Sequence, residues 1–233
     1  TSGLEARGMI LIPGNEISKD GFHLLHLDAR KVIAPHSDRQ QAINEINTEN
    51  GLAVLCHPNW HRYRDHIKLE TLQSLTDYLG IEIYNGVIHH HEGSPLATDK
   101  WDMLLSEGRK LWGFANDDSH SSEHVGVAWN MVQVKERGKE SVLEALRLGS
   151  FYASTGVAIN SIRVYGQTIF VSTQNASRIT ASVDGGLRVA QVDSSEMTFH
   201  VPDDAPWRYV RLECWGMGEA MAWTQPFYLS ESL

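Results

Sequence analysis

Short apolar runs alternate with amphipathic segments along the first two-thirds of the chain. Leu52–Cys56 is apolar throughout, which is typical of a strand buried on both faces. In Leu69–Leu79 the apolar residues recur at helical spacing, and a glycine follows directly, as is common where helices end. Strands that alternate with helices of about ten residues predict βα units and a mainly parallel sheet. The predicted strands are Met9–Ile12, Phe22–Leu27, Leu52–Cys56, Ile81–Tyr84, Lys110–Ala115 and Gly126–Val134, and the predicted helices are Leu69–Leu79, Thr98–Glu107, Glu140–Leu148 and one that begins near Ser37.

The pattern changes after about Val157. From there onward, short segments alternate apolar and polar residues with a period of two, and glycine-rich turns separate them. In Tyr209–Trp215, for example, the apolar residues share one face and the charged residues share the other. We therefore expect two domains: an α/β domain over residues 1–157 and a small antiparallel β-sandwich over residues 158–233.

The composition is that of a globular protein, and its charge argues against nucleic acids and membranes as partners. Of the 233 residues, 42% are hydrophobic and 21% are charged, which is enough for a substantial buried core. A formal net charge of −9 argues against a nucleic-acid-binding surface and against a polybasic membrane-binding surface. The apolar runs are far shorter than the ~20 residues that span a bilayer. We expect neither nucleic acid nor membrane as a partner, and Cys56 and Cys214 do not make a disulfide framework.

Polar side chains suited to chemistry follow the ends of three predicted strands. Glu16 follows the first strand, His57 follows the third, and Asp118 and His120 follow the fifth. Functional groups of parallel α/β folds collect where strands end, so we expect these residues to lie at one rim. His23 joins them if the second apolar run folds back beside the first. Taken singly, each residue has a simpler interpretation as a loop residue or a helix cap, but their joint placement favours a shared site.

A carboxylate combined with imidazoles is the ligand set of Zn²⁺, Mn²⁺ or Fe²⁺. Glu16 has two carboxylate oxygens and could bridge two ions about 3.5–4 Å apart. Such ions polarise a phosphoryl oxygen and lower the pKa of a bound water toward ~7, so no serine or cysteine nucleophile is required. The sequence therefore predicts a metal-dependent hydrolytic site.

Two further polar clusters lie near this predicted rim. His61, Arg62 and Arg64 follow His57, and the guanidinium groups match the geometry of a phosphate. This segment is either a substrate-binding element or a solvated surface loop. His89–His91 are adjacent side chains on a loop, so they point in different directions and are not expected to form one chelate, although they could contact a substrate.

Five segments recur together along the chain: Gly14–Ser18, Phe22–Leu25, Ala53–Pro58, Ile81–Asn85 and Asn116–His120. In order and spacing they resemble the successive motifs of the PHP (polymerase and histidinol phosphatase) metal-dependent phosphoesterases, over roughly residues 4–155. Segments 150–156 and 222–227 resemble the junction and last strand of family members that carry an appended β-sandwich, among them the CehA/McbA-like metallohydrolases.

The resemblance implies a distorted (β/α)7 barrel with one to three divalent metal ions at its C-terminal rim. Glu16 would be a bridging ligand, and His23 and His57 would complete the site of one ion. Asp118 would bind a second ion, and His120 would bind a third ion or the substrate phosphate. Catalytic roles are implied for His57, Asp118 and His120.

The chain departs from the family pattern at its start. PHP domains open with a strand that carries His-x-His, followed by an aspartate and a further histidine, before the motif that contains Glu16. The segment upstream of Leu4 does not supply them. We therefore expect the barrel to lack its N-terminal strands and the chain to be a fragment of a longer protein that alone hydrolyses phosphoesters weakly or not at all. The alternative is a degenerate relative.

Three functions remain open at this point. The first is metal-dependent hydrolysis of a small phosphorylated substrate, a nucleotide or a phosphodiester, by a water that the metal ions activate. The second is hydrolysis of a carbamate, ester or amide on the same scaffold, for which an apolar rim without arginine would be typical. The third is a non-catalytic binding module, supported only by tryptophans in the predicted β-strand region. Arg62 and Arg64 favour the first function.

Overall fold

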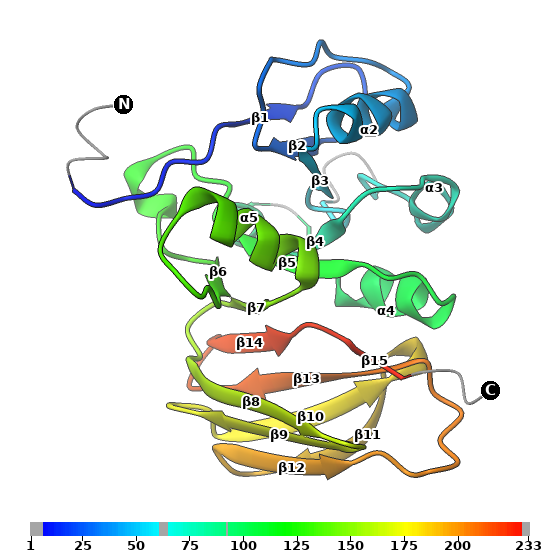
Figure 1. The fold of residues 1–233 in the computed structure, drawn as a ribbon, viewed down its shortest axis with the longest axis vertical. Helices are drawn as coiled ribbons and strands as arrows, with labels where there is room; N and C mark the ends of the chain where they lie inside the picture. Colours follow the sequence, from blue (N-terminus) through cyan, green and yellow to red (C-terminus); the bar gives the residue numbers. More distant parts are fainter. Residues whose placement is uncertain (1–6, 61–64, 92, 230–233) are drawn as a thin grey trace.

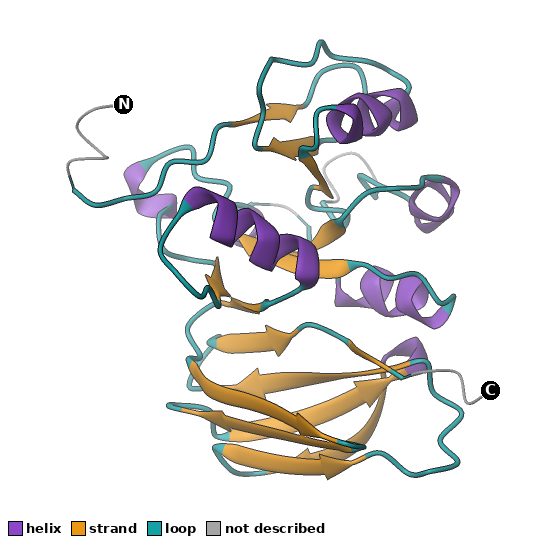
Figure 2. Ribbon diagram, in the orientation of Figure 1, coloured by secondary structure: helices purple, strands orange, loops and turns teal. Residues whose placement is uncertain are grey.

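The structure is a computed structural model that describes residues 7–60, 65–91 and 93–229. Within these ranges the chain is a β-rich fold of three sheets with short helices (Figures 1 and 2). The N-terminal sheet and the four α-helices occupy one end of the molecule, and the strands from residue 159 onward form the other end (Figure 2).

The N-terminal sheet has five strands in the order β1-β2-β3-β4-β5. The first three strands pair antiparallel, whereas β3, β4 and β5 pair parallel. The strand predicted at Met9–Ile12 is wrong, since β1 begins at Gly14, after a proline that has no N–H to donate to a ladder. The five strands are β1 (Gly14–Ile17), β2 (Leu24–Leu27), β3 (Leu52–Leu55), β4 (Gly80–Asn85) and β5 (Trp112–Asn116).

Local signals in the sequence account for the ends of several helices. The Asp38 side chain accepts hydrogen bonds from the backbone N–H groups of Gln40 and Gln41, which begins α2. Gly149 ends α5 in the left-handed conformation, with a φ of 70° that favours glycine. The four α-helices are α2 (Arg39–Thr48), α3 (Leu69–Ser74), α4 (Thr98–Ser106) and α5 (Lys139–Leu148).

Helix α3 is shorter than its apolar spacing predicts. The chain is already extended at Leu75, and the left-handed φ of 61° at Asp77 is incompatible with a continued helix. Within the described residues there are also three short 3₁₀ helices: η2 (Ile88–His90), η3 (Ser122–His124) and η4 (Asp184–Gly186). Among the helices of the described residues, none has the length and apolar character needed to cross a bilayer.

The remaining strands form two antiparallel sheets. One runs in the order β11-β10-β13-β14-β7-β6, with β15 paired to β13, and the other in the order β12-β9-β8. Their strands are β6 (Trp129–Val132), β7 (Phe151–Ser154), β8 (Ile159–Tyr165), β9 (Thr168–Thr173), β10 (Arg178–Val183), β11 (Leu187–Val192), β12 (Glu196–His200), β13 (Tyr209–Trp215), β14 (Met221–Thr224) and β15 (Phe227–Tyr228).

The predicted fold class, a distorted (β/α)7 barrel followed by a small β-sandwich, is wrong. Among the described strands only the β3–β4 and β4–β5 pairs are parallel, and β6 and β7 join the sheet of β14 instead of continuing the parallel one. Apolar periodicity reports which faces of a strand are buried, but it does not report the direction of the strand or its partner. The pairing of β7 with β14 crosses the boundary predicted at residue 157, and the two-domain division stays a prediction.

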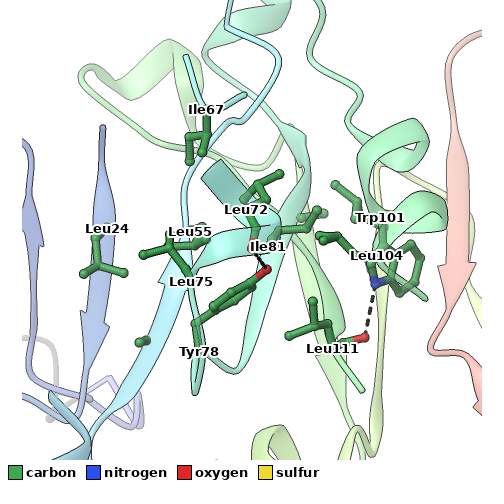
Figure 3. Close-up of a cluster of buried hydrophobic side chains, with 14 of the residues drawn as sticks. Leu24, Leu55, Ile67, Leu72, Leu75, Tyr78, Ile81, Trp101, Leu104 and Leu111 are labelled. Atoms are coloured by element: carbon green, nitrogen blue, oxygen red, sulfur yellow. Dashed lines mark hydrogen bonds between the residues drawn. The ribbon is translucent and has the colours of Figure 1, made fainter. Parts of the chain in front are cut away.

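The main hydrophobic core lies between the five-stranded sheet and the helices beside it (Figure 3). Trp101 is fully buried, and its indole N–H donates to the carbonyl oxygen of Leu111 at 3.1 Å. The Tyr78 hydroxyl likewise donates to the carbonyl oxygen of Leu72 at 3.0 Å. Both polar groups of these large aromatic side chains therefore have partners, as buried tyrosine and tryptophan require.

A buried charged cluster connects α4 to β13. Asp102 on α4 accepts two hydrogen bonds from the Arg211 guanidinium, each 2.6 Å long, and one from the Tyr209 hydroxyl at 2.7 Å. Arg211 also donates to Glu213 at 2.7 Å. Because all four residues are buried, this cluster fixes the helix against the seven-stranded sheet through charge-assisted hydrogen bonds.

His26 on β2 is fully buried, and among the described residues neither nitrogen of its ring has a hydrogen-bond partner. Burial lowers the pKa of His26, and the positive charge of Lys31 lowers it further. The negative charges of Glu49 and Asp28 raise it, but the net shift is downward. The folded state therefore holds His26 neutral at a pH where the unfolded chain, with a histidine pKa near 6.5, already binds a proton. Stability from this group is complete above about pH 6.5 and is lost as the pH falls toward the lower pKa of the folded state.

We expect the free energy of unfolding to fall more steeply between pH 7.5 and 5.5 in the wild type than in His26→Leu, because leucine does not titrate. Urea unfolding at several pH values measures both slopes. His200→Leu, at an exposed position, is the matched control and should keep the wild-type slope. An unchanged slope in His26→Leu would contradict this account.

Candidate metal centre

A cavity of about 680 Å³ lies beside the β1–β2 hairpin and the carboxyl ends of β3, β4 and β5. All five residues predicted to share a rim line this cavity, although Glu16 lies within β1 and not beyond the end of a strand. That they bind metal or act in catalysis stays a prediction. The lining residues are Glu16, His23, His57, Trp60, Val87, Ile88, His90, His91, Asp118 and His120.

The β1–β2 hairpin brings Glu16 and His23 together. Glu16 pairs with Leu25, so Glu16 and His23 are diagonal neighbours on one face of the hairpin. His23 Nδ1 lies 2.6 Å from Glu16 Oε1, and His57 Nε2 lies 3.7 Å from the same oxygen. The interactions with His23 and His57 hold the pKa of Glu16 well below its usual value. Glu16 is therefore an anion that faces two imidazoles.

His57 follows the buried strand β3 and is itself 4% exposed. Its backbone is in the left-handed region, with a φ of 33°, which is uncommon for a residue with a side chain and is typical of functional sites. Burial disfavours the imidazolium form, but the interaction with Glu16 and the charges of Glu82 and Asp118 outweigh it and raise the pKa of His57. His57 Nε2 also lies 4.0 Å from Asp118 Oδ2, so this one nitrogen is near two carboxylates.

Glu82 on β4 is buried and accepts hydrogen bonds from residues that border the cavity. It accepts the backbone N–H of His57 at 2.7 Å and the side-chain amides of Asn85 and Asn116 at 2.9 and 2.7 Å. Burial raises its pKa, opposed by the charge of His57 and by these amide donors. The sequence analysis assigned no role to Glu82, although a carboxylate within an otherwise apolar strand is itself a signal, since buried acids are rare without partners.

Asp118 follows β5 and also has a left-handed backbone, with a φ of 51°. Its carboxylate accepts a hydrogen bond from the side-chain amide of Asn85 at 3.2 Å. The preceding residue, Asp117, accepts the backbone N–H groups of residues 126–128 at 2.7–2.8 Å and so shapes the loop that follows β5. These contacts hold Asp118 near His57 Nε2, the same ring nitrogen that lies near Glu16.

His66 is the residue of this cluster that the sequence analysis missed. Ligand atoms of His23, His57 and His66 lie within 4.8 Å of one another, so the three imidazoles form a group that could hold a metal ion. The His23 backbone N–H donates to His66 Nε2 at 3.0 Å. Burial and the charges of His57 and His23 lower the pKa of His66 to about 3. The only signal in the sequence was a further histidine soon after His57, and it is indistinguishable there from a surface-loop residue.

The other predicted residues have different outcomes. His120 lines the cavity, but its side chain is 67% exposed; its Nδ1 lies 2.7 Å from the Asp118 carbonyl oxygen. His61, Arg62 and Arg64, predicted to bind substrate, lie outside the described residues.

The run His89–His91 divides between two roles. His90 and His91 line the cavity, whereas His89 faces Tyr84 and Glu219 at 3.3 and 3.2 Å. His90 also stacks on His124, with the ring centroids 5.7 Å apart. The three adjacent rings therefore do not converge on one point, as expected for a loop.

The donor set fits a divalent metal ion. Neutral imidazoles and an ionised carboxylate are the ligands that zinc and related ions prefer, and here they converge from three separate segments of the chain. His23, His57 and His66 form the group that could hold such an ion, and Glu16 lies beside two of them. Among the described residues, His57 Nδ1 is buried without a hydrogen-bond partner, so Nε2 is the nitrogen that faces the carboxylates.

Comparison with known families agrees with part of this interpretation. A protein-family model described as PHP-associated matches residues 105–151, which contain β5, Asp118, His120 and α5. No curated protein matches the chain. The matched segment supports a PHP-related family context for this chain, together with the histidine cluster that could hold a metal ion.

Proposed function

We propose that the protein is a metal-dependent phosphoesterase that hydrolyses a small phosphorylated substrate, a nucleotide or a phosphodiester. The observation that carries the proposal is the convergence of Glu16, His23 and His57 with Asp118 in one cavity of about 680 Å³. Cavities of this size enclose small molecules of the dimensions of a nucleotide. We further propose that the protein belongs to the CehA/McbA-like branch of PHP proteins. The PHP-associated match supports the PHP context and does not bear on the branch.

The residues of the site have separate tasks in this proposal. A bound divalent ion would polarise the phosphoryl oxygen and acidify a water molecule. Glu16, His23 and His57 would hold the ion, and Asp118, with Oδ2 4.0 Å from His57 Nε2, would bind a second ion. His120, exposed at the rim and 3.7 Å from Asp118, is placed to donate a proton to the departing oxygen.

Glu82 acts as a positioning residue. It holds the backbone of His57 and, through Asn85, the carboxylate of Asp118. A shift of either contact would move a ligand by a fraction of an ångström, and sites of this kind lose much of their activity when their supporting contacts are loosened.

Hydrolysis of a carbamate, ester or amide is the second candidate function. The wall formed by Trp60, Val87 and Ile88 is apolar, and no arginine or lysine lines the cavity within the part of the chain that the structure describes. Such a wall suits a substrate with a neutral organic group. Small molecules are the proposed partners in both cases, and neither nucleic acid nor membrane is.

The test is a hydrolysis assay of the full-length gene product that contains this sequence, with added Mn²⁺ or Zn²⁺. Bis-p-nitrophenyl phosphate and a nucleoside monophosphate probe the first function, and p-nitrophenyl acetate with an aryl carbamate probes the second. We expect metal-dependent phosphoester hydrolysis that falls by about 10²–10³-fold in Asp118→Asn, which keeps the shape of the side chain and removes its charge.

His200→Ala, remote from the cavity, is the control and should hydrolyse at the wild-type rate. Hydrolysis of the ester and carbamate without hydrolysis of either phosphoester would replace the first function by the second. Hydrolysis of none of the substrates, with metal bound, would leave a binding module.

A further inference from the structure

We propose that His66 is a fourth protein ligand of the ion held by Glu16, His23 and His57, so that the protein alone completes a four-coordinate set. This inference rests on the metal site of the proposed function, but it does not depend on what the protein hydrolyses.

His66 lies close to both His23 and His57. Its ring centroid lies 4.9 Å from that of His23 and 4.8 Å from that of His57. One ligand atom from each of the three imidazoles falls within the same 4.8 Å group. Glu16 Oε1 lies 2.6 Å from His23 Nδ1 and 3.7 Å from His57 Nε2, and it would supply the fourth donor.

Trp60 supports the three imidazoles together. Its ring centroid lies 5.8, 5.2 and 5.3 Å from those of His23, His57 and His66. A large apolar ring that packs against all three excludes water from one side of the cluster and restricts the rotation of each imidazole.

His66 has one competing partner. Its Nε2 accepts the backbone N–H of His23 at 3.0 Å, and a neutral imidazole has a single nitrogen lone pair. Binding an ion through this lone pair therefore requires the hydrogen bond from the His23 amide to break. One neutral hydrogen bond contributes less than a zinc–imidazole bond in a complete ligand set, so the exchange favours the ion. In the loaded protein the His23 amide would lose this acceptor.

The consequence is that the cavity would contain a structural metal site and a separate catalytic position. Zinc sites with four protein ligands are structural, whereas catalytic sites keep a position open for water. A closed site at Glu16, His23, His57 and His66 would hold the hairpin and the loop after β3 together. The reacting water would then belong to the position beside Asp118, whose Oδ2 lies 4.0 Å from His57 Nε2.

The experiment measures metal binding and not hydrolysis. Zn²⁺ titration calorimetry gives the affinity of the tightest site, and the visible absorption of the Co²⁺-loaded protein gives the coordination number, since four-coordinate Co²⁺ absorbs far more strongly than five- or six-coordinate Co²⁺. The variants are His66→Ala and His66→Gln, with His200→Ala as the matched control at an exposed histidine. Far-ultraviolet circular dichroism of each variant without metal establishes that it is folded.

We expect strong four-coordinate Co²⁺ absorption in the wild type and in His200→Ala. In His66→Ala the absorption should fall to that of a higher coordination number, and Zn²⁺ affinity should fall at least about 100-fold, beyond the usual cost of losing a residue that only supports a ligand. His66→Gln retains an acceptor for the His23 amide but is a poor zinc ligand, so it should behave like His66→Ala.

Two results would overturn the inference. Wild-type Co²⁺ absorption in His66→Ala would show that His66 is not a ligand. Wild-type affinity in His66→Gln, combined with weak binding in His66→Ala, would show that His66 acts only by holding the His23 backbone. Failure of the proposed phosphoesterase activity would leave each of these readouts unchanged.

Discussion

Replacing Asp102 with alanine is expected to lower the free energy of unfolding by about 3–5 kcal/mol, because the change leaves a buried guanidinium without its main counter-ion. Asp102 is 5% exposed and accepts hydrogen bonds from both Arg211 and Tyr209. Although burial disfavours the charged form, the hydrogen bonds and charge of Asp102, with the charge of Glu213, raise the pKa of Arg211. A guanidinium group does not deprotonate in proteins even without a counter-ion, so Arg211 stays charged in the variant and the cost of burying it is no longer offset.

The matched control is Asp193→Ala, which removes an aspartate from an exposed ion pair. Arg178 Nε lies 2.6 Å from Asp193 Oδ1, but both side chains are about half exposed or more, so the loss should be within about 1 kcal/mol. Chemical denaturation of both variants measures the difference. A loss below about 1 kcal/mol in Asp102→Ala would mean that water reaches Arg211 and that the cluster does not join α4 to β13 energetically.

Replacing Glu16 with glutamine is expected to cause the largest loss of function, on the order of 10³-fold in kcat/KM for the phosphodiester. The substitution keeps the size of the side chain and removes the negative charge. Glu16 is the carboxylate that both His23 and His57 face, and those two interactions hold it ionised. An amide oxygen is a much weaker ligand, so divalent metal ions should bind less tightly as well.

Measuring the metal content together with kcat/KM shows whether the loss of activity comes from a loss of bound metal or has another cause. If Glu16 holds the ion, Glu16→Gln should recover part of its activity as the Mn²⁺ or Zn²⁺ concentration rises. Glu70→Gln, at an exposed position in the first turn of α3, is the control and should match the wild type. Wild-type kcat/KM and wild-type metal affinity in Glu16→Gln would remove Glu16 from the site.

The contacts around Glu82 show why part of the site was not predictable from the sequence. Glu82 and His57 are 25 residues apart, and the hydrogen bond between them exists only because β3 and β4 run parallel in adjacent positions. His66 likewise belongs to the site through its position beside His23, 43 residues earlier in the chain. Residue type and local spacing carry no information about either contact.

The sequence by itself determined the features that depend on neighbours along the chain. Asp38 begins α2 because its side chain caps the first backbone N–H groups, and Gly149 ends α5 because glycine tolerates the left-handed conformation. Period-two alternation predicted antiparallel strands after about residue 157, and the segment Tyr209–Trp215 is strand β13. The positions of His57 and Asp118 beyond strand ends also followed from local pattern, and both residues line one cavity.

Only the tertiary structure decided how the strands pair. The same apolar runs are compatible with parallel or antiparallel neighbours, because periodicity specifies the buried face and not the partner. The antiparallel β1–β2–β3 arrangement brings Glu16 against His23, and the pairing of β7 with β14 replaces the expected closed barrel with separate sheets. Pairing is set by contacts between residues far apart in sequence, so the fold class and the place of His66 in the site depended on the folded chain.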